Sequence, residues 1–436
     1  MNPILYLIYQ FLKLLTKISF RVFYPNAARL NLERLRYRGG SILVSNHPNT
    51  LLDPLNAACR VPKVVHFLAN ASLFQTPFTH WFFNTFFCIP VERPQDTKGK
   101  PINNANAFRK SQQFIAGGGC LYIAPEGGSE VGRQVRPFKT GTARIILGAE
   151  ARHDFQLGLR LLPVGLTYDQ AGVFRSRMTV NAAPPIIASQ YAGLYREDPQ
   201  KAVRQLTQDL EEAVRSHAID TRDEAENTLV LKAEKLLRNC APVDGKTHFQ
   251  RTKALIANLR QMEATQPKQH LALRRQLSAY FKWLEDHQTT DAALASPISA
   301  SQWIKLFVGA PLAIYGWVNH VAGYLPRLAA ERLDIYEGYT ATVKVLCGLA
   351  VFPVSYALQT WAVGTWLGTP AAIAYLASLP LSGWWFLKWR STWQQAAARQ
   401  RFLRTPAAAR PLSERKELVE WIEGMTKQPP HEPHRN

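Results

Sequence analysis

The sequence predicts an α/β protein: a mixed, mostly parallel sheet flanked by helices, with a helical insert and C-terminal transmembrane helices. From residue 30 to residue 194, short apolar runs alternate with helix-like stretches, the pattern of strands joined by helical connections. No Asp, Glu, Lys or Arg occurs between Lys344 and Lys388. That gap is long enough for two membrane spans of about 20 residues each.

Length and charge limit the function classes. The 436 residues suggest more than one structural unit, and 52 Lys plus Arg against 32 Asp plus Glu give a net charge of +20. Such an excess indicates an anionic partner, which is a nucleic acid, a phospholipid surface or a phosphorylated substrate. A hydrophobic fraction of 47% excludes a chain that is only a disordered basic tail. The five cysteines form no Cys-x-x-Cys pair, so we expect neither a metal site nor a disulfide framework.

Residues 1–29 predict an amphipathic helix in the membrane interface. Lys13, Lys17 and Arg21 recur every four residues and therefore share one helical face, while the other faces carry Leu, Ile, Phe and Tyr. An ordinary docking helix is the alternative interpretation. A signal peptide is disfavoured, because the cations follow the apolar run and no small-residue cleavage site is present.

The α/β domain is expected over residues 30–194, with helices at Asn103–Ala116 and Gly141–Ala151. The Gly117–Gly119 run precedes a strand and lacks the Gly-Lys-Ser/Thr of a nucleotide-binding loop, so it indicates a turn. The predicted strands are Ile42–Val44, Val64–Leu68, Phe87–Val91, Leu121–Ala124, Arg160–Leu166 and Met178–Asn181.

Three further segments follow. Residues 195–300 predict a helical appendage, with Leu206, Leu210 and Val214 in one apolar stripe. Residues 301–390 predict a membrane region in which Gly368-Thr369-Pro370 separates a two-helix hairpin, although a buried soluble hairpin is the alternative. Within it, Trp303–Leu325 either spans or is re-entrant. Residues 391–436 predict a basic cytoplasmic tail, because cations flank the hairpin and its turn has none, which places both ends and the α/β domain in the cytoplasm.

The most suggestive pair for chemistry is His47 and Asp53. His47 follows the strand Ile42–Val44 at its carboxyl end, where open α/β sheets place their ligands. A carboxylate beside an imidazole holds one tautomer and stabilises the imidazolium after proton abstraction. The alternative is a histidine that is merely hydrogen-bonded in a turn.

Charged residues follow other predicted strands. Arg93 comes after the strand Phe87–Val91, and Glu126 after Leu121–Ala124. Lys139 precedes a predicted helix start, where free N–H groups attract phosphate. If the strands are neighbours, their carboxyl ends gather a base, a carboxylate and several cations in one crevice.

Five motifs stand in order along the chain: Asn46-His47 with Asp53-Pro54, Ile89-Pro90-Val91 with Arg93-Pro94, Pro125-Glu126-Gly127 with Ser129, Lys139-Thr140-Gly141 with Ala143-Arg144, and Leu162-Pro163-Val164-Gly165. Together they resemble the glycerolipid acyltransferase superfamily, whose members transfer acyl chains to glycerol-3-phosphate or lysophosphatidate. The resemblance covers roughly residues 30–190. The hydrophobic C-terminal pair also resembles a membrane-bound branch of bacterial and fungal-type glycerol-3-phosphate acyltransferases.

The resemblance implies roles for single residues. His47 corresponds to the general base that deprotonates the acceptor hydroxyl, and Asp53 to the residue that orients it. Pro163 lies in the block linked to the acyl donor, and Arg93 is the expected phosphate partner. The implied partners are acyl-CoA or acyl carrier protein as donor, a phosphorylated glycerol and membrane phospholipid, with no cofactor. The residues implied in substrate binding are Asn46, Arg93, Glu126, Gly127, Ser129 and Pro163, to which the cationic placement of Lys139 adds one more.

The chain departs from the usual pattern at three points. Five residues rather than four separate His47 from Asp53, a spacing shared with the membrane-bound branch, so a turn must absorb the extra one. Asn70 stands where related sequences often carry lysine, and Gly128 where threonine is common. These changes leave the acceptor open between glycerol-3-phosphate and 1-acylglycerol-3-phosphate. Two rivals are a non-catalytic lipid-binding scaffold on the same fold and a nucleic-acid-binding protein, the latter favoured by charge alone and without a reading motif.

Overall fold

The computed structural model describes residues 2–85, 87–92, 104–333, 335–405 and 409–427. The chain forms two compact units. The first comprises Met1–Arg222 and Ile335–Thr342, and the second comprises Asp223–Asp334 and Val343–Asn436.

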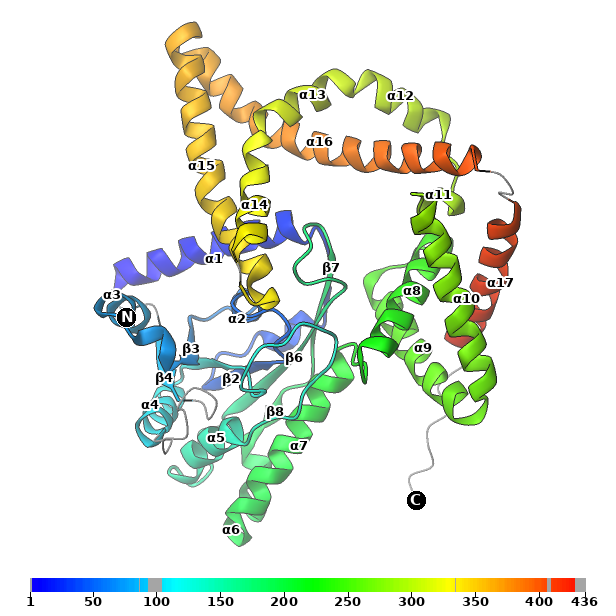
Figure 1. Ribbon diagram of the computed structural model, residues 1–436. Helices are drawn as coiled ribbons and strands as arrows, with labels where there is room; N and C mark the ends of the chain where they lie inside the picture. Colours follow the sequence, from blue (N-terminus) through cyan, green and yellow to red (C-terminus); the bar gives the residue numbers. More distant parts are fainter. Residues whose placement is uncertain (1, 86, 93–103, 334, 406–408, 428–436) are drawn as a thin grey trace. The chain divides into compact units, whose positions relative to one another are not determined.

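The first unit is built on a mixed, mostly parallel sheet, which confirms the predicted fold class (Figure 1). Strand order is β1-β7-β6-β2-β5-β3-β4, with β8 paired to β6. Only the pairs β6–β7 and β6–β8 are antiparallel among the described strands. The strands are β1 Asn26–Leu30, β2 Ser41–Ser45, β3 Val65–Asn70, β4 Cys88–Val91, β5 Cys120–Ile123, β6 Arg160–Tyr168, β7 Arg177–Ala182 and β8 Ile186–Ile187.

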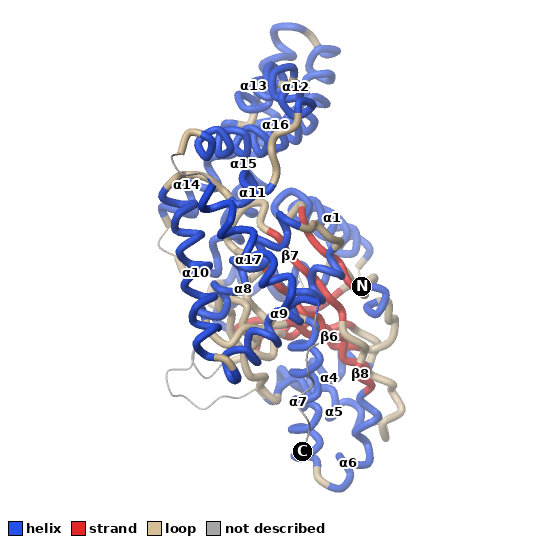
Figure 2. The backbone as a smooth tube through the Cα atoms, turned by 90° about the vertical axis from the view of Figure 1, so that its right-hand side faces the viewer, coloured by secondary structure: helices blue, strands red, loops and turns tan. Residues whose placement is uncertain are grey.

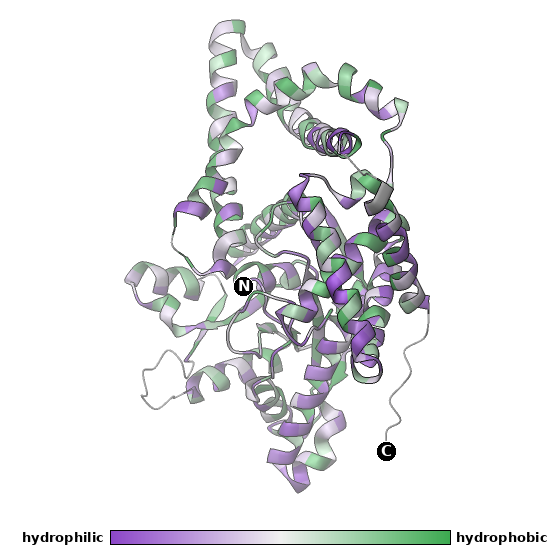
Figure 3. Ribbon diagram, turned by 45° about the vertical axis from the view of Figure 1, so that its right-hand side comes forward, coloured by the Kyte–Doolittle hydropathy of each residue, from purple (hydrophilic) through white to green (hydrophobic). Residues whose placement is uncertain are grey.

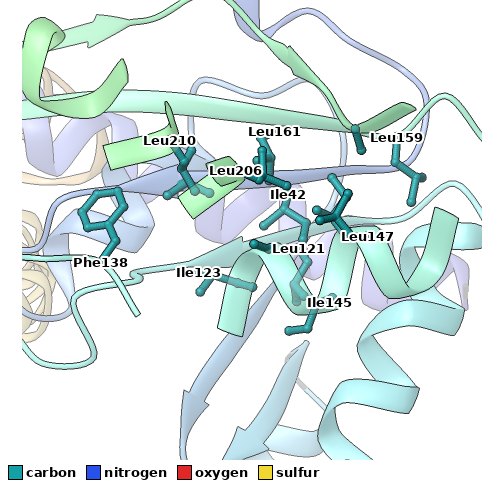
Figure 4. Close-up of a cluster of buried hydrophobic side chains, with 14 of the residues drawn as sticks. Ile42, Leu121, Ile123, Phe138, Ile145, Leu147, Leu159, Leu161, Leu206 and Leu210 are labelled. Carbon is teal, nitrogen blue, oxygen red and sulfur yellow. The ribbon is translucent and has the colours of Figure 1, made fainter. Parts of the chain in front are cut away.

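Helices cover both faces of this sheet (Figure 1). Helix α5 (Gly141–Ala151) and helix α7 (Pro199–His217) pack on one face, and α1 (Pro3–Phe23) and α2 (Leu52–Ala58) lie on the other. The close-up in Figure 4 shows the core between the sheet and the first pair of helices. Its labelled side chains include Ile42, Leu121, Ile145, Leu147, Leu161, Leu206 and Leu210.

The six predicted strands are confirmed, with ends that move by one to a few residues. The sequence missed β1, β8 and α2, because none shows a clear apolar period: β1 reads Asn-Ala-Ala-Arg-Leu, and α2 is seven residues long. Helix α4 is Ala105–Ala116, and the predicted start at residue 103 lies outside the described residues. Helix α7 packs in the α/β core, so the contact boundary falls at Arg222 rather than at the expected residue 194.

The second unit is helical. Helix α17 packs against α9, and Asn258 donates a hydrogen bond to the Met425 carbonyl oxygen. Arg415 of α17 binds the fully buried Asp291 with an Nε–Oδ1 distance of 2.8 Å. Figure 2 shows α17 beside α10 in this helical unit. Helix α16 runs through the first part of the expected basic tail at 391–436, and α17 packs against α9 and α10. The cytoplasmic placement of this segment stays a prediction. The helices are α8 Glu224–Cys240, α9 Gly245–Thr265, α10 Pro267–Asp286, α11 Asp291–Ala295, α12 Ala300–Val308, α13 Ala310–Asn319, α14 Leu325–Arg332, α15 Thr340–Leu367, α16 Thr369–Leu403 and α17 Ala409–Lys427.

Helices α15 and α16 follow one another across Gly368, which has a positive φ of 83°. The two-helix membrane hairpin expected there stays a prediction. Among the described residues, one helix, Glu337–Leu367, is long and apolar enough to cross a membrane, although length and composition alone are weak grounds. Helix α16 does not reach that hydropathy. Large apolar side chains of α15 are exposed and include Val354, Leu358 and Trp361. Figure 3, coloured by residue hydropathy, shows hydrophobic stretches in green along this helix. The segment expected to span or re-enter at 303–325 forms the short helices α12 and α13, broken at Gly309.

Candidate active site

The predicted site residues gather at one edge of the sheet because their strands are neighbours. β2 and β5 pair in parallel with Val44 opposite Ile123, so the loops that follow them leave the sheet side by side. The two loops are also bonded directly, since the Glu130 N–H donates to the His47 carbonyl oxygen at 3.2 Å. His47 and Glu126 therefore share one edge, as the sequence predicts.

His47 and Asp53 form the expected pair. Nδ1 of His47 lies 3.0 Å from Oδ2 of Asp53, which is fully buried, whereas the imidazole is 18% exposed. Asp53 also accepts hydrogen bonds from the Asn49 N–H at 2.6 Å and from the Tyr168 hydroxyl at 2.8 Å. Its position in the first turn of α2 favours the negative charge further. Because Asp53 acts as the acceptor, the proton of neutral His47 resides on Nδ1, and Nε2 keeps a free lone pair.

The extra residue of the His-x5-Asp spacing is absorbed at Thr50. This residue has a φ of 21°, unusual for a β-branched side chain. The turn around it is closed by the Leu52 N–H donating to the Asn49 carbonyl oxygen at 2.9 Å. As a result α2 begins at Leu52, which brings Asp53 back within hydrogen-bond distance of the imidazole.

Asn46 holds the His47 loop to β6. Its amide donates to the Leu166 carbonyl oxygen at 2.8 Å and accepts from the Leu166 N–H at 2.7 Å, and the side chain is buried. Both ends of the amide are thus occupied within the protein. Binding of substrate by Asn46 stays a prediction.

Glu126 is paired with Arg136, a residue that the sequence reasoning missed. Arg136 donates to Oε2 of Glu126 from Nη2 at 2.8 Å and from Nε at 3.1 Å, and it also reaches Glu130. Burial raises the pKa of the Glu126 carboxyl, while Arg136 and the charge of His47 lower it. The only sequence signal for Arg136 is its place three residues before Lys139. Among the described residues, the buried Oε1 of Glu126 has no hydrogen-bond partner.

Gly127 and Lys139 lie in contact. Gly127 has a φ of 76°, and a Cβ built there would stand 2.4 Å from Lys139 Nζ, so a side chain would displace the lysine. The Lys139 N–H donates to the Pro125 carbonyl oxygen at 2.9 Å, which fixes the approach to α5. The structure thus places an exposed ammonium group against the Glu126–Gly127 turn.

The remaining predicted residues are more scattered. The Ser129 carbonyl oxygen accepts from the Tyr336 hydroxyl at 3.2 Å. Pro163 lies within β6 opposite Val44, where the strand changes partner from β8 to β7 and needs no N–H. Arg93 lies outside the described residues. Within the described residues, no group of three His, Cys, Asp or Glu side chains is placed to hold a metal ion.

An imidazole oriented by a buried carboxylate, at the carboxyl edge of a mostly parallel sheet, defines a class of site suited to general-base chemistry on a hydroxyl group. Residues 29–167 match the family model described as Acyltransferase. This segment, about a third of the chain, therefore matches an acyltransferase domain.

Similar proteins carry related names. The chain is 33% identical over 106 residues to glycerol-3-phosphate O-acyltransferase 2 of Saccharomyces cerevisiae, covering 24% of this chain and 14% of that protein. It is 26% identical over 125 residues to glycerol-3-phosphate O-acyltransferase 1 of the same yeast, covering 28% and 16%. The chain therefore spans about a seventh of the length of these relatives. A solved structure, the 1-acyl-sn-glycerophosphate acyltransferase PlsC of Thermotoga maritima, matches with a TM-score of 0.33 and 17% identity over 46% of this chain and 78% of that one.

Proposed function

We propose that this chain is an O-acyltransferase that moves a fatty acyl group from acyl-CoA or acyl carrier protein to the hydroxyl of glycerol-3-phosphate. The observation that carries the proposal is the 3.0 Å contact between His47 Nδ1 and the buried Asp53, inside a domain that matches the Acyltransferase model. The names of the two yeast relatives favour glycerol-3-phosphate over 1-acylglycerol-3-phosphate, which is the second acceptor to test.

In this mechanism Nε2 of neutral His47 accepts the proton of the acceptor hydroxyl while the oxygen attacks the thioester carbonyl carbon. A C–O bond forms and the C–S bond breaks, and the imidazolium returns the proton to the leaving thiolate. Asp53 stabilises the positive imidazolium through its ionised carboxylate. The products are an ester and a free thiol, so no covalent intermediate on the protein is needed.

The acceptor phosphate is assigned to cations beside the Glu126 loop. Arg136 is already engaged by Glu126 and Glu130, whereas the ammonium of Lys139 is exposed beside Gly127. Lys139 is therefore the described cation that we assign to phosphate, with Arg93 as its expected partner. Gly127 leaves room for that lysine to lie against the loop.

We place the enzyme at a membrane, with its α/β domain on the cytoplasmic side. An ordinary docking helix would bury its apolar stripe, but α1 exposes Ile4, Leu7, Phe11 and Leu14. Only its inward residues engage the domain, for example Tyr9, whose hydroxyl accepts from the Val65 N–H at 3.1 Å. Helix α3 (Pro77–Thr85) adds a second exposed apolar set, and α15 supplies an apolar helix of spanning length.

The test is product analysis with full-length protein in lipid nanodiscs, using labelled acyl-CoA and a panel of phosphorylated glycerols. We expect acylation of glycerol-3-phosphate by the wild type. The rate should fall about 10²- to 10⁴-fold for His47→Ala, the usual loss when a general base is removed. His270→Ala on α10 is the matched control and should retain full activity.

Undiminished transfer by His47→Ala would contradict the assignment of the base. Binding of acyl-CoA without any product would instead support the lipid-binding scaffold. Acylation of 1-acylglycerol-3-phosphate but not of glycerol-3-phosphate would assign the second acceptor.

A further inference from the structure

A short segment much further along the chain lies against both loops of the candidate active site. Residues 335–342, which we name the strap, belong to the first unit, although the preceding residue of that unit is Arg222. The last three residues of the strap are also the first turn of α15. The strap therefore leads without a break into α15, the one described helix that is long and apolar enough to cross a membrane.

The strap holds the His47 loop through Thr50. The Thr50 hydroxyl donates to the Gly338 carbonyl oxygen at 2.8 Å and lies 3.2 Å from the Thr342 hydroxyl. Thr50 and Thr342 are both buried. Thr50 is the residue that absorbs the extra position between His47 and Asp53. The hydrogen bonds of its hydroxyl therefore act at a residue with an unfavourable backbone conformation.

The strap holds the Glu126 loop through Tyr336. Its hydroxyl donates to the Ser129 carbonyl oxygen at 3.2 Å and accepts from the Val131 N–H at 3.3 Å, so it clamps the backbone on either side of Glu130. Glu130 is in turn bonded to the His47 carbonyl oxygen. The strap and the two loops thus form one hydrogen-bonded ring.

The strap fits closely between these contacts. A Cβ added at Gly338 would lie 2.6 Å from the Tyr336 ring and 3.1 Å from Thr50 Cγ2. A side chain at Gly338 would therefore push apart the two residues that reach the two loops. The sequence requirement for glycine at this position follows from the packing.

We propose that the strap positions the catalytic machinery, with Thr50 and Thr342 setting the His47 loop and Tyr336 setting the Glu126 loop. These are positioning residues, since they act through His47 and Glu126. The proposal rests on the proposed acyl transfer and assigns a catalytic purpose to the chain segment that leads into α15. Loss of the threonine bonds affects the chemical step, and loss of the tyrosine bonds affects acceptor binding.

Steady-state kinetics of full-length variants in nanodiscs provide the first test. Thr50→Val and Thr342→Val keep the side-chain shape but lose the hydroxyl, so kcat should fall about tenfold, with the KM for acyl-CoA unchanged. Thr50→Ser and Thr342→Ser keep the hydroxyl and should restore kcat. Tyr336→Phe should raise the KM for glycerol-3-phosphate more than it lowers kcat.

The matched control for the tyrosine is Tyr339→Phe. Tyr339 lies in the same segment, is half exposed, and its hydroxyl makes no hydrogen bond to any residue that the structure describes. This variant should behave as the wild type in both kcat and KM.

Hydrogen–deuterium exchange gives a readout that does not need activity. Peptides covering 45–56 should exchange faster in Thr50→Val, and peptides covering 126–136 faster in Tyr336→Phe, with Tyr339→Phe unchanged. If the wild type transfers acyl groups and the valine and phenylalanine variants match their controls in kinetics, the strap proposal is wrong. If exchange rises as expected in Thr50→Val and Tyr336→Phe but the wild type shows no transferase activity, the proposed function is wrong, while the role of the strap in holding the two loops is supported.

Discussion

Among the described residues, Asp53 accepts three hydrogen bonds: from the His47 Nδ1–H, the Asn49 N–H and the Tyr168 hydroxyl. An ionised carboxylate satisfies three donors at once, whereas an amide must turn its own N–H₂ toward at least one of them. Asp53 is fully buried, so its carboxylate is not in contact with bulk solvent that could relieve that conflict. The negative charge of Asp53 and the orientation of its hydrogen bonds therefore depend on each other.

Asp53→Asn should lower kcat by about 10²- to 10⁴-fold, since the imidazolium loses its counter-charge and its tautomer is no longer fixed. The measurement is the kcat of full-length protein in nanodiscs. Asp198→Asn is the control, because Asp198 is the N-cap of α7 and asparagine caps a helix about as well. Equal activity of Asp53→Asn and the wild type would show that the carboxylate does not support the base.

Individual site residues were predictable where the signal was local. His47, Asp53, Glu126 and Lys139 each lie near a strand or helix end that the sequence reveals. Their partners were not predictable in the same way. Tyr168 reaches Asp53 across 115 positions and Gly338 reaches Thr50 across 288, and no periodicity encodes such contacts. Arg136 lies only 10 positions from Glu126 but carries no motif of its own.

At the scale of elements, an apolar stripe predicts a buried face without naming what covers it. The stripe of Leu206, Leu210 and Val214 was correctly predicted as helical, yet α7 packs on the α/β sheet rather than in the appendage. In the stretch 303–325, by contrast, polar residues within an apolar run make contacts that the sequence does not reveal. Asn319 and His320 interrupt its apolar run, but they bind α15 and α16: Nε2 of His320 lies 2.8 Å from the Tyr356 hydroxyl, and the Tyr375 hydroxyl donates to Asn319.

Leu206→Ala should therefore destabilise the first unit. Leu206 is fully buried between α7 and the sheet, and truncation of such a leucine lowers the free energy of unfolding by about 2–5 kcal/mol. Urea titration, monitored by hydrogen–deuterium exchange of peptides that cover β2 and β6, would report this loss. Leu271→Ala, at an exposed position of α10, should leave those peptides unchanged. Identical midpoints for the two variants would place α7 outside the core.

At the scale of the whole molecule, the net charge of +20 and the apolar surface of α15 point to the same environment. Cations near an anionic leaflet gain about 1 kcal/mol each, and exposed apolar side chains gain by leaving water. A soluble hairpin would bury the apolar face of α15, yet Val354, Leu358 and Trp361 are each more than half exposed. Only 11% of the most apolar window of this helix is buried within the protein.

If α15 crosses a bilayer, the full-length chain should stay with membranes through alkaline carbonate extraction. Val354→Arg together with Leu358→Arg should release a large fraction, because each arginine near the centre of a span costs about 2.5–3.5 kcal/mol on insertion scales. Glu420→Arg adds a cation at an exposed position of α17 and should leave the protein in the pellet. Release of the wild type by carbonate would mean that α15 does not span, and α1 would then be the membrane contact that remains. Retention of the double variant at the wild-type level would equally exclude α15 as the anchor.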